Sequence, residues 1–91
     1  MTRRYIITGR VQGVGFRWFV EREARAIGVG GWVRNTEDGA VEVLGSGSNE
    51  QLARLRKALE SGPRAARVDE VHEFEEEQQT SETTFRIEGA W

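Results

Sequence analysis

Cysteine is absent from this chain of 91 residues, and histidine occurs only once, as His72. Without cysteine there is no disulfide, no thiol nucleophile and no thiolate metal site. A serine–histidine nucleophile would have to use His72, and a zinc site built on it would need acidic residues to complete the ligand set. We therefore expect an activity that needs no metal ion, and we expect no other cofactor.

The chain also has no long apolar segment: no apolar run approaches the roughly 18 residues of a membrane span. The N-terminal segment has two arginines but a short apolar stretch, Tyr5-Ile6-Ile7, whereas a signal peptide needs about 7–15 apolar residues. We expect a cytoplasmic protein that does not contact membranes. Its 37% hydrophobic and 31% charged residues are typical of a soluble domain, and the length predicts one domain over residues 1–91.

The charge is nearly balanced, with 13 basic and 15 acidic residues and a net charge of −2. This balance does not indicate nucleic-acid binding, and we expect a monomer without a nucleic-acid partner. The distribution is uneven, because arginines dominate residues 1–34 while residues 69–77 are strongly acidic. A local positive field near the N-terminal half is therefore compatible with a slightly acidic molecule.

The apolar spacing predicts alternating strands and helices. Strands are expected over residues 4–8, 32–36, 41–43, 67–74 and 84–88, and a first helix over residues 16–27. A second helix is expected after Ser48, whose pairing with Gln51 predicts a capping box, and should stop at Gly62-Pro63. Val68 and Val71 break the alternation of the fourth strand, which predicts a bulge or a shifted boundary. Residues 75–82 are expected to form a polar connection.

This order predicts an α+β fold of the ferredoxin-like βαββαβ type. Two helices would pack on one face of a mainly antiparallel, four- to five-stranded sheet, which buries the apolar stripes of both helices. The fold hosts many activities and by itself indicates none of them.

The segment from Gly9 to Arg17 joins the first strand to the first helix. The first turn of a helix has unpaired N–H groups that favour an anion, and Gly13 and Gly15 allow the loop to turn several N–H groups towards one point. Arg17 could bind two oxygens of a phosphate held there. Alternatively, the glycines serve only a tight turn and the arginine is solvated. The segment has neither the Gly-Lys-Ser/Thr of a Walker loop nor the third glycine of a dinucleotide fingerprint.

Asn35 lies near the end of the second strand and shares the face of Val33, two residues earlier. If Val33 points into the core, Asn35 points to the helix side, where a polar amide needs a partner. The alternative role is to stabilise the following turn, Thr36 to Gly39, as asparagine often does. Arg34 has the opposite parity and is expected to face solvent. Glu23, on the apolar side of the first helix, is either a partner of an arginine or an edge residue of the stripe.

Both segments resemble the signatures of the acylphosphatase family. The first signature, Gly-x-Val-Gln-Gly-Val-x-Phe-Arg, is complete at Gly9–Arg17, and the second, Gly-Trp-Val-Arg/Lys-Asn with a following Asp-Gly-x-Val-Glu, is complete within residues 31–42. The resemblance extends along essentially the whole chain. It departs at the C-terminus, where many members have an aromatic-x-Ile-Arg-Tyr-like strand and this chain has residues 85–91, FRIEGAW.

The resemblance implies metal-independent hydrolysis of acyl phosphates to a carboxylate and inorganic phosphate. Arg17 and Asn35 would be the catalytic pair, and the phosphate would be bound by the backbone of Gln12, Gly13, Val14, Gly15, Phe16 and Arg17. Two other functions remain open: a non-catalytic phosphate-binding regulatory module, and an RNA-binding module. RNA-binding sheets of this fold stack bases on aromatic residues, and here only Tyr5 is aromatic among the expected residues of the first and third strands.

Overall fold

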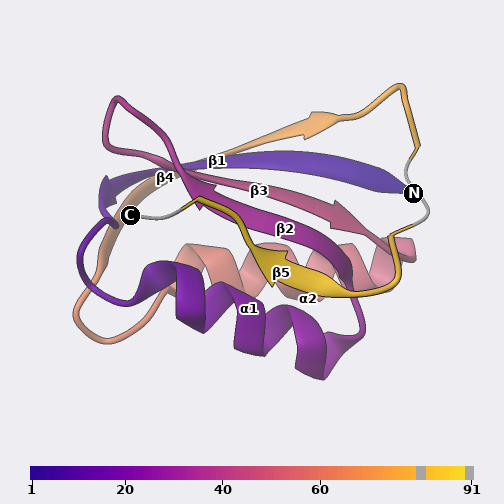
Figure 1. The fold of residues 1–91 in the computed structure, drawn as a ribbon, viewed down its shortest axis with the longest axis horizontal. Coiled ribbons are helices and arrows are strands. Elements are labelled where there is room, and N and C mark those ends of the chain that lie inside the picture. The colour runs from indigo at the N-terminus through magenta and orange to yellow at the C-terminus, as the bar shows by residue number, and fades with distance from the viewer. Residues whose placement is uncertain (80–81, 90–91) are drawn as a thin grey trace.

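The computed structural model describes residues 1–79 and 82–89, which form two helices and five strands. The elements are β1 (Thr2–Arg10), α1 (Phe16–Ile27), β2 (Gly30–Asn35), β3 (Val41–Ser46), α2 (Asn49–Ser61), β4 (Arg67–Glu75) and β5 (Phe85–Ile87). The sheet order is β4-β1-β3-β2-β5. Both helices cover one face of the sheet (Figure 1), which confirms the predicted ferredoxin-like α+β fold.

Each helix turns a stripe of apolar residues to the sheet. In α1 the buried residues are Phe16, Val20 and Ala24, and in α2 they are Leu52, Leu55 and Leu59. The predicted capping box of α2 is present, because Ser48 and Gln51 exchange side-chain and backbone hydrogen bonds of 2.9 and 3.1 Å. Gln51 also donates to the Ile27 carbonyl at 3.3 Å, so the start of α2 is attached to the end of α1.

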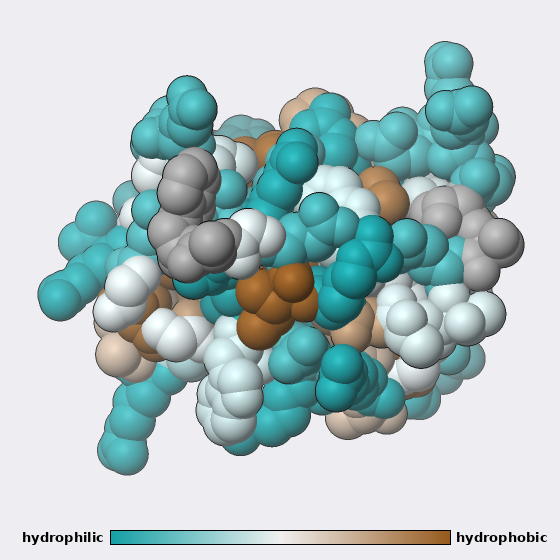
Figure 2. All heavy atoms as spheres, viewed as in Figure 1, coloured by the Kyte–Doolittle hydropathy of each residue, from teal (hydrophilic) through white to brown (hydrophobic). Residues whose placement is uncertain are grey.

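The core lies between the helix layer and the sheet. The strands contribute Tyr5, Ile7, Val33, Val41, Val43 and Phe85 to it, all with at most 1% of their surface exposed. Most of the face seen in Figure 2 is hydrophilic, and apolar side chains appear there only as small separate patches. No helix among the described residues is long and apolar enough to cross a membrane.

The strands differ from the predicted ones mainly at their ends. β1 is longer than the expected residues 4–8, β2 begins two residues earlier and ends one residue earlier than expected, and β5 is shorter than residues 84–88. The irregularity expected in the fourth strand is a β-bulge: the pairing with β1 shifts between Thr8 and Gly9, which face Glu70 and Val68. The polar connection expected over 75–82 includes residues 80–81, which lie outside the described residues.

The sheet is mixed rather than purely antiparallel. β1 pairs antiparallel with β3 and β4, and β2 pairs antiparallel with β3, but the edge strand β5 runs parallel to β2. Arg25 of α1 donates two hydrogen bonds, of 3.2 and 3.1 Å, to the Phe85 carbonyl of β5. The short edge strand is therefore attached both to the sheet and to α1.

Candidate active site

The loop between β1 and α1 has the backbone conformation that the glycine pattern suggested. Gly13 and Gly15 have φ values of 73° and 78°, in the left-handed region that favours glycine, and a Cβ atom at either position would meet nothing within 4 Å. Glycine is therefore required here for the backbone turn and not for space. Gly15 is also the residue that caps α1, and it has no side chain to bond the first N–H groups of the helix. Those N–H groups are available for an anion.

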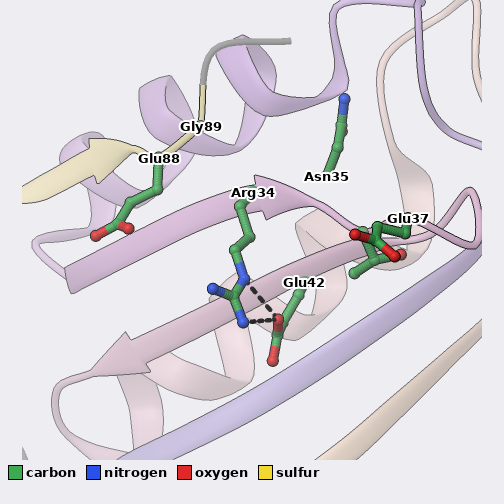
Figure 3. A pocket seen from close by; sticks show the side chains of 7 residues that line it. Arg34, Asn35, Glu37, Glu42, Glu88 and Gly89 are labelled. Carbon is green, nitrogen blue, oxygen red and sulfur yellow. Dashed lines mark hydrogen bonds and ion pairs between the residues drawn. The ribbon is translucent and has the colours of Figure 1, made fainter.

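Asn35 is the last residue of β2 and is paired in register with Val41 of β3. Its neighbour Val33, on the same face, is fully buried in the core. Figure 3 shows the Asn35 amide pointing to the side of the sheet where α1 lies, and Arg34 pointing the opposite way. The alternation of the strand therefore directs Asn35 towards the glycine loop.

One cleft brings the two predicted catalytic residues together. Its volume is about 280 Å³, and its lining comprises Val11, Gly13, Gly15, Phe16, Arg17, Trp18, Asn35, Ile87 and Gly89. The loop and the first turn of α1 form one side, and the ends of β2 and β5 form the other. Gln12 and Val14, expected in the phosphate-binding loop, are absent from this lining.

Gln12 instead connects the loop to the turn that follows Asn35. Its Nε2 donates to the carbonyl oxygens of Thr36 and Ala40, each at 2.8 Å. Thr36 and Ala40 close that turn with their own hydrogen bonds, including Thr36 N–H to the Ala40 carbonyl at 2.9 Å. The Gln12 side chain therefore fixes the position of the loop relative to the end of β2. Sequence reasoning missed this role, because the acceptors are backbone atoms that any residue could provide.

Arg17 is half-buried on the α1 side of the cleft. Among the described residues no carboxylate lies within ion-pair distance of it, whereas most of the other arginines are paired with a glutamate or aspartate. A guanidinium that lines the same cleft as a helix start and a polar amide attracts an anion.

A second cleft lies on the other side of Asn35. Its lining comprises Arg34, Asn35, Thr36, Glu37, Glu42, Glu88 and Gly89 (Figure 3). Arg34 binds Oε1 of Glu42 with its Nε and Nη2, both at 2.8 Å, and Arg4 reaches Oε2 of the same carboxylate at 3.3 Å. The Arg34 side chain is half exposed, as expected, but it is also an ion-pair partner of the nearly buried Glu42, and the sequence did not reveal this contact. Glu42 holds three neighbouring strands together.

The other titratable residues considered from the sequence, His72 and Glu23, do not line the first cleft. His72 is on β4, at the sheet edge opposite β5, and its Nε2 is 3.8 Å from Glu70. Glu23 forms no ion pair with an arginine of the described residues, and the ion pair of α1 joins Glu21 and Arg25. Within residues 1–79 and 82–89 there is no group of three histidine, cysteine, aspartate or glutamate residues that could hold a metal ion. The C-terminal departure from the family pattern includes residues 90–91, outside the described part.

The fold and the cleft together describe a small α+β protein with an arginine-lined cleft at the start of a helix. The acylphosphatase family model matches residues 3–87. The chain belongs to the acylphosphatase family, and it is an enzyme that hydrolyses acyl phosphates.

Similar proteins cover nearly the whole chain. An acylphosphatase of Koribacter versatilis is 57% identical over 90 residues, which are 99% of this chain and 82% of the relative. An acylphosphatase of Pasteurella multocida is 46% identical over 96% of this chain and 97% of its own. The crystal structure of acylphosphatase from Bacillus subtilis superposes with a TM-score of 0.93 at 36% identity, covering 97% of this chain and 98% of that one. These similarities confirm the family and the activity that the two sequence signatures predicted, and the fold class that the order of strands and helices predicted.

Proposed function

We propose that Arg17 and the loop N–H groups hold the phosphate of the acyl phosphate, and that Asn35 positions the attacking water. The observation that carries this proposal is the cleft itself. It places a half-buried arginine without a carboxylate partner among the described residues and a strand-end amide around the same space. The backbone of Gln12 to Arg17 would supply the N–H groups, and the Gln12 side chain would keep this loop at a fixed distance from Asn35.

The chemistry of the substrate explains why so few groups suffice. The leaving group is a carboxylate whose conjugate acid has a pKa of roughly 4, so it departs at neutral pH without a general acid. Phosphoryl transfer needs mainly positioning and charge stabilisation, and Arg17 with the loop can provide both without a metal ion. An amide is not a base, but the Asn35 carbonyl oxygen can accept a hydrogen bond from water and direct it in line with the leaving oxygen.

We also propose that one copy of the chain is sufficient and that nucleic acid is not a partner. Both sides of the cleft come from the same chain, which supports a monomeric enzyme. On the sheet face away from the helices, Arg4, Arg34 and Arg86 are each paired with a glutamate. Their charge is already compensated, so this face offers little to a phosphate backbone.

The Asn35→Ala variant separates this mechanism from a module that only binds phosphate. If Asn35 positions water, kcat should fall on the order of 10²–10³-fold, as when one preorganised polar group is removed from an active site. Affinity for inorganic phosphate, measured by competitive inhibition, should change little, because Arg17 and the loop remain.

The other asparagine of the chain, Asn49 at the exposed start of α2, provides the matched control. Asn49→Ala should leave kcat and phosphate affinity unchanged. If Asn35 only stabilises the turn, Asn35→Ala will instead lower the melting temperature while each folded molecule keeps a normal kcat. That result would remove Asn35 from the mechanism and favour the binding module.

A further inference from the structure

Trp18 is an exposed aromatic residue beside the candidate active site. Its surface is 60% accessible, more than that of Met1 or Phe74, the other exposed large apolar side chains among the described residues. It lies in the first turn of α1, directly after Arg17, and lines the same cleft. An indole left in water at the edge of a cleft is available to contact a bound molecule.

Arg22, one helical turn later, keeps this indole in place. Its guanidinium lies over the Trp18 ring, 4.9 Å from the ring centroid, at the i,i+4 spacing that brings side chains together on a helix. The Trp18 side chain is therefore exposed, but its contact with Arg22 limits its motion. Little conformational entropy is then lost when a ligand contacts the indole. Phe74 has a similar arrangement under Arg4, at 4.8 Å, but it lies on β4, away from this cleft.

The direction of the reaction places the acyl group near Trp18; this step rests on the proposed function. In an in-line displacement the attacking water and the leaving oxygen lie on opposite sides of the phosphorus. Asn35 would hold the water on the sheet side of the cleft, so the leaving carboxylate and its acyl group point away from Asn35, past the phosphate, towards the part of the cleft lined by Trp18. The second cleft, with Glu37, Glu42 and Glu88, lies beyond Asn35 on the water side and is not where the acyl group would lie.

We propose that Trp18 contacts the acyl group and makes the enzyme select aromatic or bulky apolar acyl phosphates over small ones. The indole provides a flat apolar surface next to the residue that binds the phosphate. An aromatic acyl group can pack on it while the phosphate stays on Arg17, whereas an acetyl group is too small to cover it. Trp18 is thus a specificity-determining residue that takes no part in the chemical step.

The experiment compares kcat/KM for benzoyl phosphate and for acetyl phosphate. Trp18→Ala should lower the value for benzoyl phosphate about threefold to tenfold, the effect of losing one aromatic contact, and change the value for acetyl phosphate less than about twofold. Trp18→Phe, which keeps a ring, should restore most of the preference. Inhibition by inorganic phosphate should be the same in all three proteins.

Phe74→Ala is the matched control, because it removes another exposed aromatic residue stacked with an arginine. It should leave the ratio of the two kcat/KM values unchanged. An unchanged ratio in Trp18→Ala, or an equal change in Phe74→Ala, would overturn the proposal for Trp18. Neither result would bear on the proposed roles of Arg17 and Asn35. Those roles are tested separately, and they would be contradicted if the Arg17 and Asn35 variants hydrolysed both substrates normally.

Discussion

Arg17 is a half-buried arginine that has no carboxylate partner in the described part of the chain and lies at a helix start that has no side-chain cap. A guanidinium can form two parallel hydrogen bonds to a phosphate, whereas a lysine ammonium acts as a single point charge. The geometry of the charge, and not only its sign, is therefore expected to matter at this position.

Arg17→Ala should reduce kcat/KM about 10³–10⁵-fold, the contribution of arginines that stabilise a transferring phosphoryl group. Arg17→Lys should recover only part of that loss. Arg64, exposed in the turn after α2, supplies the control, and Arg64→Lys should behave like the unmodified enzyme. Full activity in Arg17→Lys would show that a positive charge alone is sufficient.

The sequence predicted the residue types of the site more completely than their contacts. Arg17 and Asn35 could be identified as candidate site residues because a glycine loop before a helix and a polar residue at the end of a strand are local patterns. The hydrogen bonds of Gln12 could not be predicted in this way, since their acceptors lie 24 and 28 positions away in the sequence. The Arg34–Glu42 pair likewise depends on the register of two strands, which a single strand pattern does not contain.

At the scale of the elements, helices were predicted better than strands. α1 was predicted with its observed bounds, and the cap and the end of α2 were correct, because helix signals are local. The parallel pairing of β5 with β2 depends on where the chain returns after β4, and no feature of residues 85–87 encodes that choice. Strand ends were misplaced by one to three residues, most at the end of β3, because pairing partners, and not propensity, decide where a strand stops.

Tyr5 joins β1 to α2, and this contact makes the stability of the protein sensitive to alkaline pH. The Tyr5 hydroxyl is buried and donates to the Leu52 carbonyl at 3.4 Å. Burial, reinforced by the nearby Glu73 carboxylate, raises the pKa of Tyr5 from 10.0 to about 12. The native state therefore holds the proton more tightly than the unfolded chain, and the resulting stabilisation is fully present below pH 10 and is lost as the pH rises towards 12.

We expect the free energy of unfolding to fall with rising pH by up to about 3 kcal/mol over this range, the equivalent of two pKa units. Tyr5→Phe should be less stable at neutral pH but should lack this particular decline. Urea unfolding of both proteins at pH 8, 10 and 11 measures the difference. Tyr5 is the only tyrosine of the chain, so its ultraviolet absorbance follows the titration directly. Parallel pH profiles for the two proteins would contradict the assignment.

At the scale of the whole molecule, every polar group that the mechanism uses belongs to the β1–α1 loop, the start of α1 or the end of β2. The only histidine is at the far edge of the sheet, and the described residues offer no cluster of metal ligands. The proposed mechanism therefore relies entirely on the protein's own charges and dipoles.

Exhaustive treatment with EDTA should leave hydrolysis of benzoyl phosphate unchanged, and added Mg²⁺ or Zn²⁺ should not increase it. An untreated sample carried through the same dialysis controls for losses of protein. A large loss of activity that Mg²⁺ or Zn²⁺ restores would refute a metal-independent site.

The strand order β4-β1-β3-β2-β5 also determines how the molecule can form during synthesis on a ribosome. β1 is the first strand to emerge, and it can pair with β3 once about half of the chain has been made. The other edge of β1 can pair only after β4, residues 67–75, has been synthesised. Until then this edge exposes unpaired backbone groups to any neighbouring chain. The nascent protein therefore contains the glycine loop and Asn35 well before it can close its sheet, and β5, with the residues that complete the cleft, emerges last.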